Sequence, residues 1–527
     1  MRTTATVIGL GFLVMGIAFA SGAPEADSPA AREFVIGNGA APTALDPHQI
    51  SSPREHRIVM GLFEGLVAPD PETSRATPGL AEWWEITDDG LEYTFFLRQG
   101  AVWSDGTGIT AHDVVDSWLR VLNPRTAAPS AWLPAQFIKG AQEFHLGEAG
   151  AEAVAIRAVD DYTFQFEAVQ PTPYLLDLLS HYAFQVVPLH IIDEQGDQWT
   201  RPENFVGNGP YTLTEWDSQG RVVLQRNDSY WNAPSVRLDR VVFAPIENDI
   251  EAFDQYADGE FDWLPAVSSE HQGEARQRDD YHVSPDLQTT LYLMNTEREP
   301  LDDPDVRRAL SAVIDRQRMV ETVTGAGEIP AYALVPPISG YPGIEGIQED
   351  VATARQLLAD AGYPGGAGFP SLTVRHPASE DHQAVAEFVQ SQWRDNLGIE
   401  VRLESLPRVS FASQIQQGDF DIAPAGWIGA FQDPAAFLDL FVTGGELNHG
   451  RFRSERYTLR VAEAARMDSD DNRFSTLQEA ERILIEGQTG VIPLYHHANR
   501  NLIDLSEWGG WYANVMNVHP VGDIYEY

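Results

Sequence analysis

Cysteine is absent from all 527 residues of the sequence. Disulfide bonds, thiolate metal sites, a cysteine nucleophile and a lipid-modified N-terminal cysteine are therefore excluded. The chain is long enough to bury a large core, so it does not depend on cross-links for its stability. Because a single core stops growing at about 250 to 300 residues, we expect more than one domain.

Positive charge is scarce as well. The sequence has 35 Lys and Arg against 78 Asp and Glu, a formal net charge of −43, and Lys139 is its only lysine. A surface this negative repels nucleic-acid phosphates and anionic membranes. We therefore expect no nucleic-acid partner, and we interpret most of the acids as a solvated surface.

Long apolar runs are missing beyond the N-terminus. Arg2, the apolar stretch 7–19 and a small-residue cleavage site form the pattern of a secretion signal. We predict a signal peptide at 1–20, with cleavage after Ala23 as the alternative, and a polar linker at 21–32. No later apolar run is long enough to span a membrane. The sequence thus predicts a soluble protein outside the cytoplasm.

Motifs of the common enzyme classes are also absent. The sequence has no HExxH, no G-x-S-x-G and no phosphate-binding loop. The histidines His376 and His382, and the pair His496 and His497, lack a third ligand at a spacing that would hold a metal. We predict no metal site, no cofactor and no catalysis. A carboxylate pair hidden among the 78 acids, as in a secreted hydrolase, stays an alternative.

Strand and helix patterns are clear in the rest of the chain. Residues 91–98 and 399–406 alternate apolar and polar side chains, as half-buried strands do. Residues 304–323 carry apolar side chains on one face and are followed by Gly325, which predicts a single helix. A second predicted helix at 382–397 leads directly into the strand at 399–406, as in an α/β layer.

One local pattern occurs twice. "YADGEFDWLP" at 256–265 and "IQQGDFDIAP" at 415–424 each indicate a helix end, a Gly cap, an acid, Phe, Asp and an apolar strand. The second copy continues into the run "AGWIGAF", which has almost no reactive side chains. Two junctions of the same design predict two α/β lobes.

Longer stretches of the sequence resemble a known family. "YTFFLRQGAVWSDGTGITAHDVVDSWLRVLNP" at 93–124, "VGNGPYTLTEW" at 206–216, "RNDSYWN" at 226–232 and "FDIAPAGW" at 420–427 are similar, in this order, to the oligopeptide-binding receptors of bacterial ABC importers, solute-binding protein family 5. The resemblance spans almost the whole mature chain. It implies an α/β fold of the periplasmic-binding-protein type II-like, cluster C kind, with two lobes that close like a hinge on a ligand.

The resemblance also implies a division of the chain. We expect lobe I at 33–63, 188–288 and 498–527, an extra domain at 64–187, and lobe II at 289–497. The two repeated junctions then fall one in each lobe.

A peptide bound to such a receptor is held as an added strand. Its main chain pairs with backbone groups of the receptor, while its side chains enter tolerant, water-filled pockets. Ala425, Gly426 and Trp427 match one of the pairing edges. The full set of expected ligand-binding residues is Ala425, Gly426, Trp427, Ile428, His382, Arg408, Asp433 and Ser51.

Three positions depart from the family's pattern. The family has an aspartate for the peptide ammonium three residues after the Trp, where this sequence has Ala430. Pro424 replaces a basic residue three positions before the Trp, and Thr324 replaces a lysine. Without a buried carboxylate a free ammonium loses several kcal/mol of stabilisation, so we expect unmodified tri- to pentapeptides to bind weakly.

Other charged residues are candidates for these contacts. His382 matches a histidine that reaches the peptide carboxylate, and Arg408 stands where the family often has a tryptophan facing the pocket. Asp433 is the candidate substitute for the missing acid.

We therefore predict a monomeric periplasmic binding protein, not a lipoprotein, that delivers a peptide or peptide-like solute to the permease and ATPase subunits of an ABC importer. An oligosaccharide, an opine or another conjugate is the alternative ligand. The secreted hydrolase is the alternative from another class.

Overall fold

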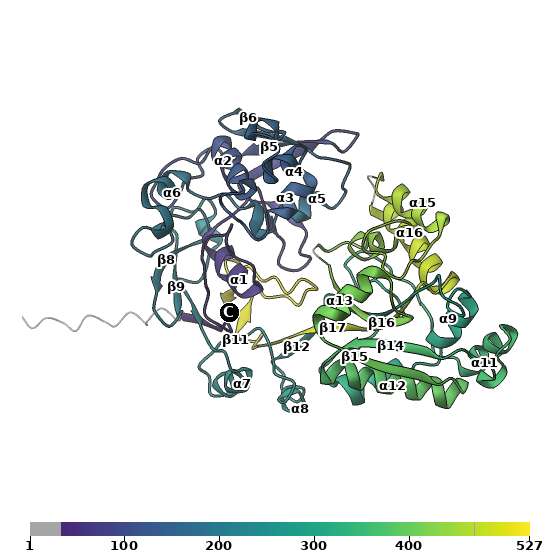
Figure 1. Cartoon of the computed structure of the whole chain (residues 1–527). Helices are drawn as coiled ribbons and strands as arrows, with labels where there is room; N and C mark the ends of the chain where they lie inside the picture. Colours follow the sequence, from purple (N-terminus) through teal and green to yellow (C-terminus); the bar gives the residue numbers. More distant parts are fainter. Residues whose placement is uncertain (1–32, 430, 468–469) are drawn as a thin grey trace, which may run out of the picture.

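The computed structural model describes residues 33–429, 431–467 and 470–527. The predicted signal peptide and linker, and Ala430, lie outside these residues. The described chain forms two bodies on either side of a pair of long strands (Figure 1). The predicted fold class is confirmed, with two α/β lobes and an additional domain on the first.

One large sheet runs through both lobes. Its strand order is β15-β14-β16-β12-β17-β11-β1-β10-β9-β8, and β13 pairs with β17. β12 (Tyr281–Met294) and β17 (Val491–Ile503) lie in the middle of this order and pair antiparallel. They are the crossover strands, because each continues from one lobe into the other.

Lobe I is built around the first strand of the described chain. β1 pairs in parallel with β10 and β11, so both of its edges are paired, and its side chains Phe34 and Ile36 are buried in the core of this lobe. The C-terminal segment returns to this lobe, where Trp508 packs edge-on against Phe34 with 4.6 Å between the ring centroids. The elements are β1 (Glu33–Gly37), α1 (Pro53–Leu62), α6 (Leu189–Gln195), β8 (Tyr211–Trp216), β9 (Val222–Arg226), β10 (Arg240–Ala244), α7 (Asp249–Ala257), β11 (Trp263–Leu264), α8 (Gln272–Ala275), β18 (Trp508–Gly509) and β19 (Tyr525–Glu526).

The extra domain has its own sheet and core. Its antiparallel sheet has the order β4-β5-β7-β6, and Trp118 of α2 packs on Phe164 and Phe166 of this sheet. The domain lies above lobe I in Figure 1. Its elements are β2 (Val67–Pro69), β3 (Ala76–Pro78), β4 (Ala81–Ile86), β5 (Glu92–Leu97), α2 (Ala111–Leu122), α3 (Trp132–Phe137), α4 (Ala141–His145), β6 (Ile156–Asp160), β7 (Thr163–Glu167) and α5 (Leu175–Leu178).

Lobe II packs its helices around the other half of the sheet. β14 and β15 are parallel, with the 18-residue helix α12 between them in the chain. The elements are α9 (Pro304–Ser311), α10 (Arg316–Met319), β13 (Ile329–Pro330), α11 (Val351–Asp360), β14 (Leu372–Pro377), α12 (Glu380–Leu397), β15 (Val401–Leu406), α13 (Arg408–Gln417), β16 (Ile422–Ile428), α14 (Ala435–Leu438), α15 (Glu455–Ala464) and α16 (Asp470–Arg482).

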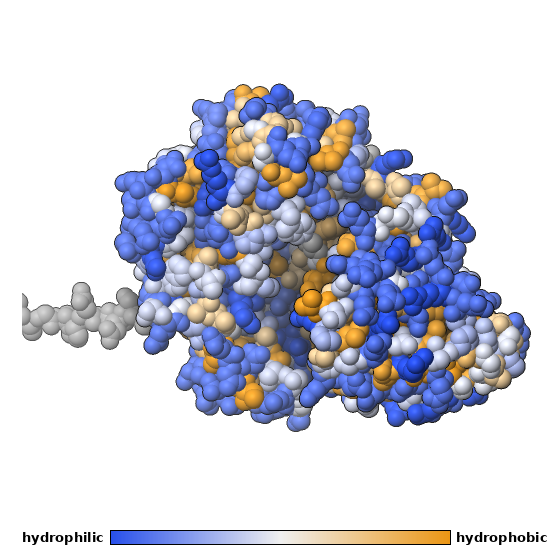
Figure 2. All heavy atoms as spheres, in the orientation of Figure 1, coloured by the Kyte–Doolittle hydropathy of each residue, from blue (hydrophilic) through white to orange (hydrophobic). Residues whose placement is uncertain are grey.

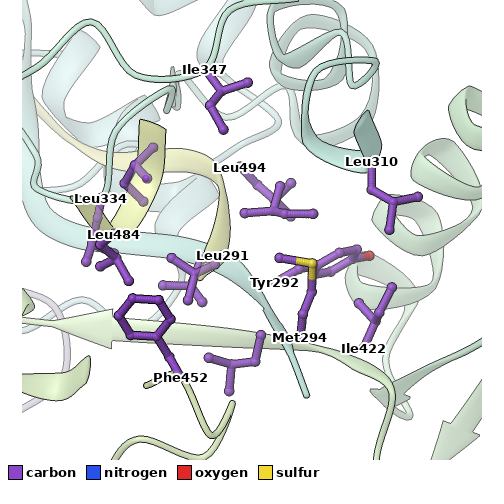
Figure 3. Packing of buried hydrophobic residues seen from close by; sticks show 14 of the residues in the cluster. Leu291, Tyr292, Met294, Leu310, Leu334, Ile347, Ile422, Phe452, Leu484 and Leu494 are labelled. Atoms are coloured by element: carbon purple, nitrogen blue, oxygen red, sulfur yellow. The ribbon is translucent and has the colours of Figure 1, made fainter. Parts of the chain in front are cut away.

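The core of lobe II contains the ends of the crossover strands. Figure 3 shows Leu291, Tyr292 and Met294 of β12 beside Ile422 of β16 and Leu494 of β17. All five side chains are buried. The crossover strands are therefore fixed to lobe II by hydrophobic packing as well as by strand pairing.

Both repeated junctions predicted from the sequence are confirmed. α7 ends at Ala257, and Gly259 takes a positive φ of 81° before β11. α13 ends at Gln417, and Gly418 takes a positive φ of 72° before β16. Glycine suits both turns because it adopts this conformation without a steric penalty.

The single helix predicted at 304–323 is wrong. The structure has α9 and α10 instead, followed by a wider turn at 320–324. Asp315 begins the second helix, because its side chain accepts a hydrogen bond from the backbone N–H of Arg318. Arg316 turns inward and donates to the carbonyl of Pro493 and to the hydroxyl of Ser311.

Two predicted domain boundaries fall inside the crossover strands. The boundary at 288/289 lies in β12, and the boundary at 497/498 lies in β17. The chain thus passes between the lobes without a break in secondary structure, and the boundaries stay predictions. Within the residues that the structure describes, no helix has the length and apolar character needed to cross a membrane.

Candidate functional site

A groove separates lobe II from the body formed by lobe I and the extra domain. Figure 2 shows it as a hollow between the two bodies, with apolar surface on the lobe II side. β12 and β17 are the strands that pass between the lobes, so movement of one lobe against the other must bend this pair.

β16 presents a free strand edge. On one side it pairs antiparallel with β12, from Ile422 opposite Met294 to Ile428 opposite Gln288. On the other side it pairs with β14 only at Ile422. Beyond that residue no strand among the described residues covers this side of β16.

The direction of the backbone groups follows from two hydrogen bonds at the ends of the β12–β16 ladder. The N–H of Gly429 donates to the carbonyl of Leu287, and the N–H of Asn295 donates to the carbonyl of Asp421. In an antiparallel pair, alternate residues point their N–H and C=O groups to the same side. Odd-numbered residues from 421 to 429 therefore face β12. Gly426 and Ile428 point both backbone groups to the free edge.

The side chains along this edge leave it accessible. Gly426 is exposed, and Ile428 is 65% exposed. A Cβ at Gly426 would meet only the Gln288 side chain, at 3.9 Å, so no clash within the protein requires glycine there. Trp427 is half-buried, and its indole N–H donates to the carbonyl of Ala436 at 2.6 Å, which fixes the ring on the lobe II side. The predicted residues Ala425 to Ile428 thus form one edge, with space for another backbone.

Two helix N-termini lie near the carboxyl ends of the parallel strands β14 and β15. Ser379 caps α12, and its hydroxyl contacts Nδ1 of His382 at 2.7 Å. α13 begins at Arg408 directly after β15. Ligands of α/β proteins bind at such strand ends, and helix N-termini favour anions.

His382 and Arg408 belong to one electrostatic neighbourhood. Partial burial lowers the pKa of His382, and the nearby His376 and Arg408 lower it further. Both His382 and Arg408 are exposed, so their polar groups are available to a ligand. The structure therefore brings these two predicted residues together, at the end of the sheet where β16 projects.

The crossover strands are joined by two side-chain contacts at adjacent positions. Thr289 contacts Nδ1 of His496 at 2.8 Å, and Thr290 contacts Nε2 of His497 at 2.9 Å. Burial lowers the pKa of His496 to about 3, and burial also lowers the pKa of His497. Both imidazoles are therefore neutral at pH 7 and serve as hydrogen-bonding links. Among the described residues, no group of three His, Cys, Asp or Glu is arranged to hold a metal ion.

The sequence predicts that Asp433 contacts the ligand, but in the structure its side chain does not face the groove. Its side chain is fully buried, and its two oxygens accept from Nη1 and Nη2 of Arg473 at 2.6 and 2.5 Å. The backbone N–H of Ala435 also donates to this carboxylate. A carboxylate engaged in this way is not free for a ligand ammonium, so the geometry argues against the predicted role.

The remaining predicted positions are scattered. Ser51 is exposed in lobe I, just before α1, and its backbone N–H donates to Glu55. Pro424 is buried in β16 and contributes a carbonyl but no N–H. Thr324 donates from its hydroxyl to Glu328 at 2.8 Å. Ala430 lies outside the described residues.

A small pocket was not predicted from the sequence. It lies where lobe I, the extra domain and lobe II meet, and has a volume of about 50 Å³. Phe431 of lobe II stacks on Tyr174 of the extra domain beside it, with 4.0 Å between ring centroids. Its walls come from distant parts of the chain, and among them only Phe431 lies in a segment that the sequence singles out, at the end of the run "AGWIGAF".

Comparison with known proteins shows that the chain is similar to periplasmic binding proteins. The chain is 33% identical to the periplasmic oligopeptide-binding protein OppA of Salmonella typhimurium, over 99% of this chain and 98% of that protein. It is 32% identical to the probable deoxycholate-binding periplasmic protein YgiS of Escherichia coli, over 88% of each.

Among solved structures, the unliganded open form of the murein tripeptide binding protein MppA aligns with a TM-score of 0.89 and 31% identity, over 94% of this chain and 98% of that one. Another structure of the Escherichia coli murein tripeptide binding protein has the same identity and coverage but a TM-score of 0.67. The present structure therefore superposes better on the unliganded open form than on this second structure.

The family model for bacterial extracellular solute-binding proteins, family 5, matches residues 75–449, which is more than half of the chain. With this match, and with relatives above 30% identity along nearly the whole length, the chain belongs to family 5 of the bacterial extracellular solute-binding proteins.

Proposed function

We propose that this protein captures a peptide or peptide-like solute in the groove between its lobes and delivers it to the permease and ATPase subunits of an ABC importer. It works in the periplasm, as a monomer, and releases the ligand chemically unchanged. The observation that carries this proposal is the free edge of β16, where Gly426 and Ile428 direct N–H and C=O groups outward. An extended main chain pairs with such an edge whatever its side chains are.

The positions of charge support an orientation for this ligand. Arg408, His382 and the N-termini of α12 and α13 favour a carboxylate at the strand ends of lobe II. The amino end of the ligand then points the other way, past Ile428 toward Phe431 and Gln432. This orientation agrees with the family resemblance, in which the amino end lies beside position 430.

A non-peptide solute is the second candidate. Its support is the relative named as a probable deoxycholate-binding protein, together with the loss of charged anchors at Pro424 and Thr324. A ligand without a peptide main chain cannot pair with the β16 edge as an added strand. The two candidate functions therefore differ in whether the backbone groups of β16 contribute to binding affinity.

The test is a titration of the purified protein with pooled tri- to pentapeptides, half with free and half with acetylated N-termini, followed by tryptophan fluorescence. We expect saturable binding, and chromatography of the released peptides should return them unchanged. Shortened peptides would indicate the secreted hydrolase. Binding of deoxycholate but of no peptide would favour the second candidate.

A further inference from the structure

The pocket at the three-way junction has mostly apolar walls, including Phe431, Met516 and Val518, and a few polar atoms in them have open hydrogen-bonding capacity. Three residues that line it come from three parts of the fold: His56 from lobe I, Ser74 from the extra domain and Gln432 from lobe II. The polar atoms concerned are Nε2 of His56, Oγ of Ser74 and Oε1 of Gln432. Each of these atoms is buried without a hydrogen-bond partner among the described residues. Ser74 is 7% exposed and Gln432 is 4% exposed. Buried polar atoms are rarely left this way, so three of them around one cavity indicate a site for a polar group.

The walls of this pocket supply no free negative charge. Asp177 is the acid that lines it, and its two oxygens accept from Nη1 of Arg75 and from the backbone N–H of Ala76, each at 2.8 Å. Asp433, next to Gln432, is held by Arg473. An ammonium placed here would lose its water without gaining a counter-charge.

The histidines of the pocket do not supply a charge either. Burial, together with the nearby Arg57, lowers the pKa of His56 to about 4. Burial lowers the pKa of His181, which also lines the pocket, to about 3. At pH 7 the walls thus offer neutral hydrogen-bond donors and acceptors.

The size of the pocket limits what can enter. A water molecule needs about 10 to 15 Å³ of this kind of space. The volume of about 50 Å³ therefore holds a group of roughly three or four non-hydrogen atoms. An acetyl or formyl amide has this size and carries both a carbonyl acceptor and an N–H donor.

From these observations we propose that the natural ligand is a peptide whose amino end is blocked by a small neutral acyl group, and that His56, Ser74 and Gln432 bind this end. The inference rests on the proposed function, because it needs a main chain on the β16 edge to bring the end of the ligand past Phe431. It specifies the chemical class of that ligand.

The experiment compares two peptide libraries of three to five residues, identical except that one is N-acetylated. Affinities are measured on the full-length mature protein by competition titration. We expect the acetylated library to bind at least about tenfold more tightly. Equal or tighter binding of the free library would overturn the inference and leave the proposed function intact. Binding of neither library would overturn the proposed function, and the inference with it.

Substitutions in the pocket sharpen this comparison. Gln432→Glu supplies a carboxylate of the same shape, and we expect it to raise the affinity for the free library about tenfold while lowering that for the acetylated one. Ser74→Asp places a carboxylate on the part of the wall that the extra domain supplies, and it replaces the first variant in the experiment if Gln432→Glu does not fold. Gln414→Glu, on α13, makes the same change at another buried amide oxygen without a partner. If the ratio of the affinities for the acetylated and the free library changes equally in Gln432→Glu and Gln414→Glu, the pocket has no specific role in binding the amino end.

Discussion

Gly426 carries a backbone N–H that points to the free edge of β16, where the main chain of the proposed ligand pairs. Replacing it with proline removes this donor without removing a bond to β12, because the N–H of Gly426 points to the free edge. Proline is tolerated on that side of a strand, and Pro424 already occupies the same side. We expect Gly426→Pro to lower ligand affinity about tenfold, as the loss of a hydrogen bond in a dry site does, with little change in melting temperature.

The control for this variant is Gly426→Ala, which keeps the donor and fits the space around the residue. It should bind ligand nearly as the unaltered protein does. Equal affinity in the proline and alanine variants would mean that the β16 edge does not pair with the ligand.

Asp433 provides a second test at the residue scale. With Arg473 only 2% exposed, Asp433→Asn leaves a buried guanidinium without its carboxylate. The expected cost is about 3 to 5 kcal/mol in the free energy of unfolding, measured by denaturant titration. The double change Asp433→Leu with Arg473→Met should recover much of this loss, because it removes both charges. A single variant with unaltered stability but lost ligand binding would restore Asp433 to the ligand site.

Several elements of the fold could be predicted from the sequence. The strands β5 and β15 follow directly from alternating side chains, and Gly398 and Gly418 end their helices at positive φ. The helix at 304–323 was predicted wrongly, because the inward turn of Arg316 depends on the carbonyl of Pro493, far away in the chain. The order of strands in the sheet is not predictable from local patterns for the same reason.

The candidate site also has parts that the sequence predicts and parts that it does not. The β16 edge could be predicted because its residues are consecutive and match a family motif. The buried ion pair with Arg473 argues against the predicted ligand contact of Asp433, and nothing in the segment around Asp433 indicates that Arg473 lies against it. The pocket of His56, Ser74 and Gln432 exists only when three distant segments meet, so no local pattern contains it.

The crossover strands give a prediction at the scale of elements. The hydroxyl of Thr289 donates to the carbonyl of Leu334 at 3.0 Å, so its oxygen accepts from Nδ1–H of His496. Burial holds the pKa of His496 at about 3, below its ordinary value of 6.5. The neutral ring contributes stability that is fully present above pH 6.5 and is lost as the pH falls toward the folded-state pKa. Each pH unit below 6.5 costs about 1.4 kcal/mol from this group.

The measurement is the free energy of unfolding at pH 6.5 and pH 5 for the unaltered protein and for His496→Gln. Between pH 6.5 and pH 5 we expect the free energy of unfolding to fall by about 2 kcal/mol less in the variant than in the unaltered protein, because glutamine does not titrate. Parallel curves for the unaltered protein and for His496→Gln would show that His496 is not held neutral.

The whole molecule combines three features that suit a receptor. Two lobes with separate cores are joined by continuous strands, their arrangement matches an unliganded open form, and an acidic surface of net charge −43 surrounds them. Since the strands β12 and β17 carry the connection, closure on a ligand needs a change in only a few residues between the lobes. Under the proposed function, this closure turns the groove with its free strand edge into a closed site around an extended ligand chain.

The most direct test of this account is native mass spectrometry of the protein purified from its own host. We predict one retained molecule per chain, with the mass of a short peptide or peptide conjugate, that is recovered unchanged after prolonged incubation with the protein. A protein that retains nothing and converts peptides to smaller products would contradict the account.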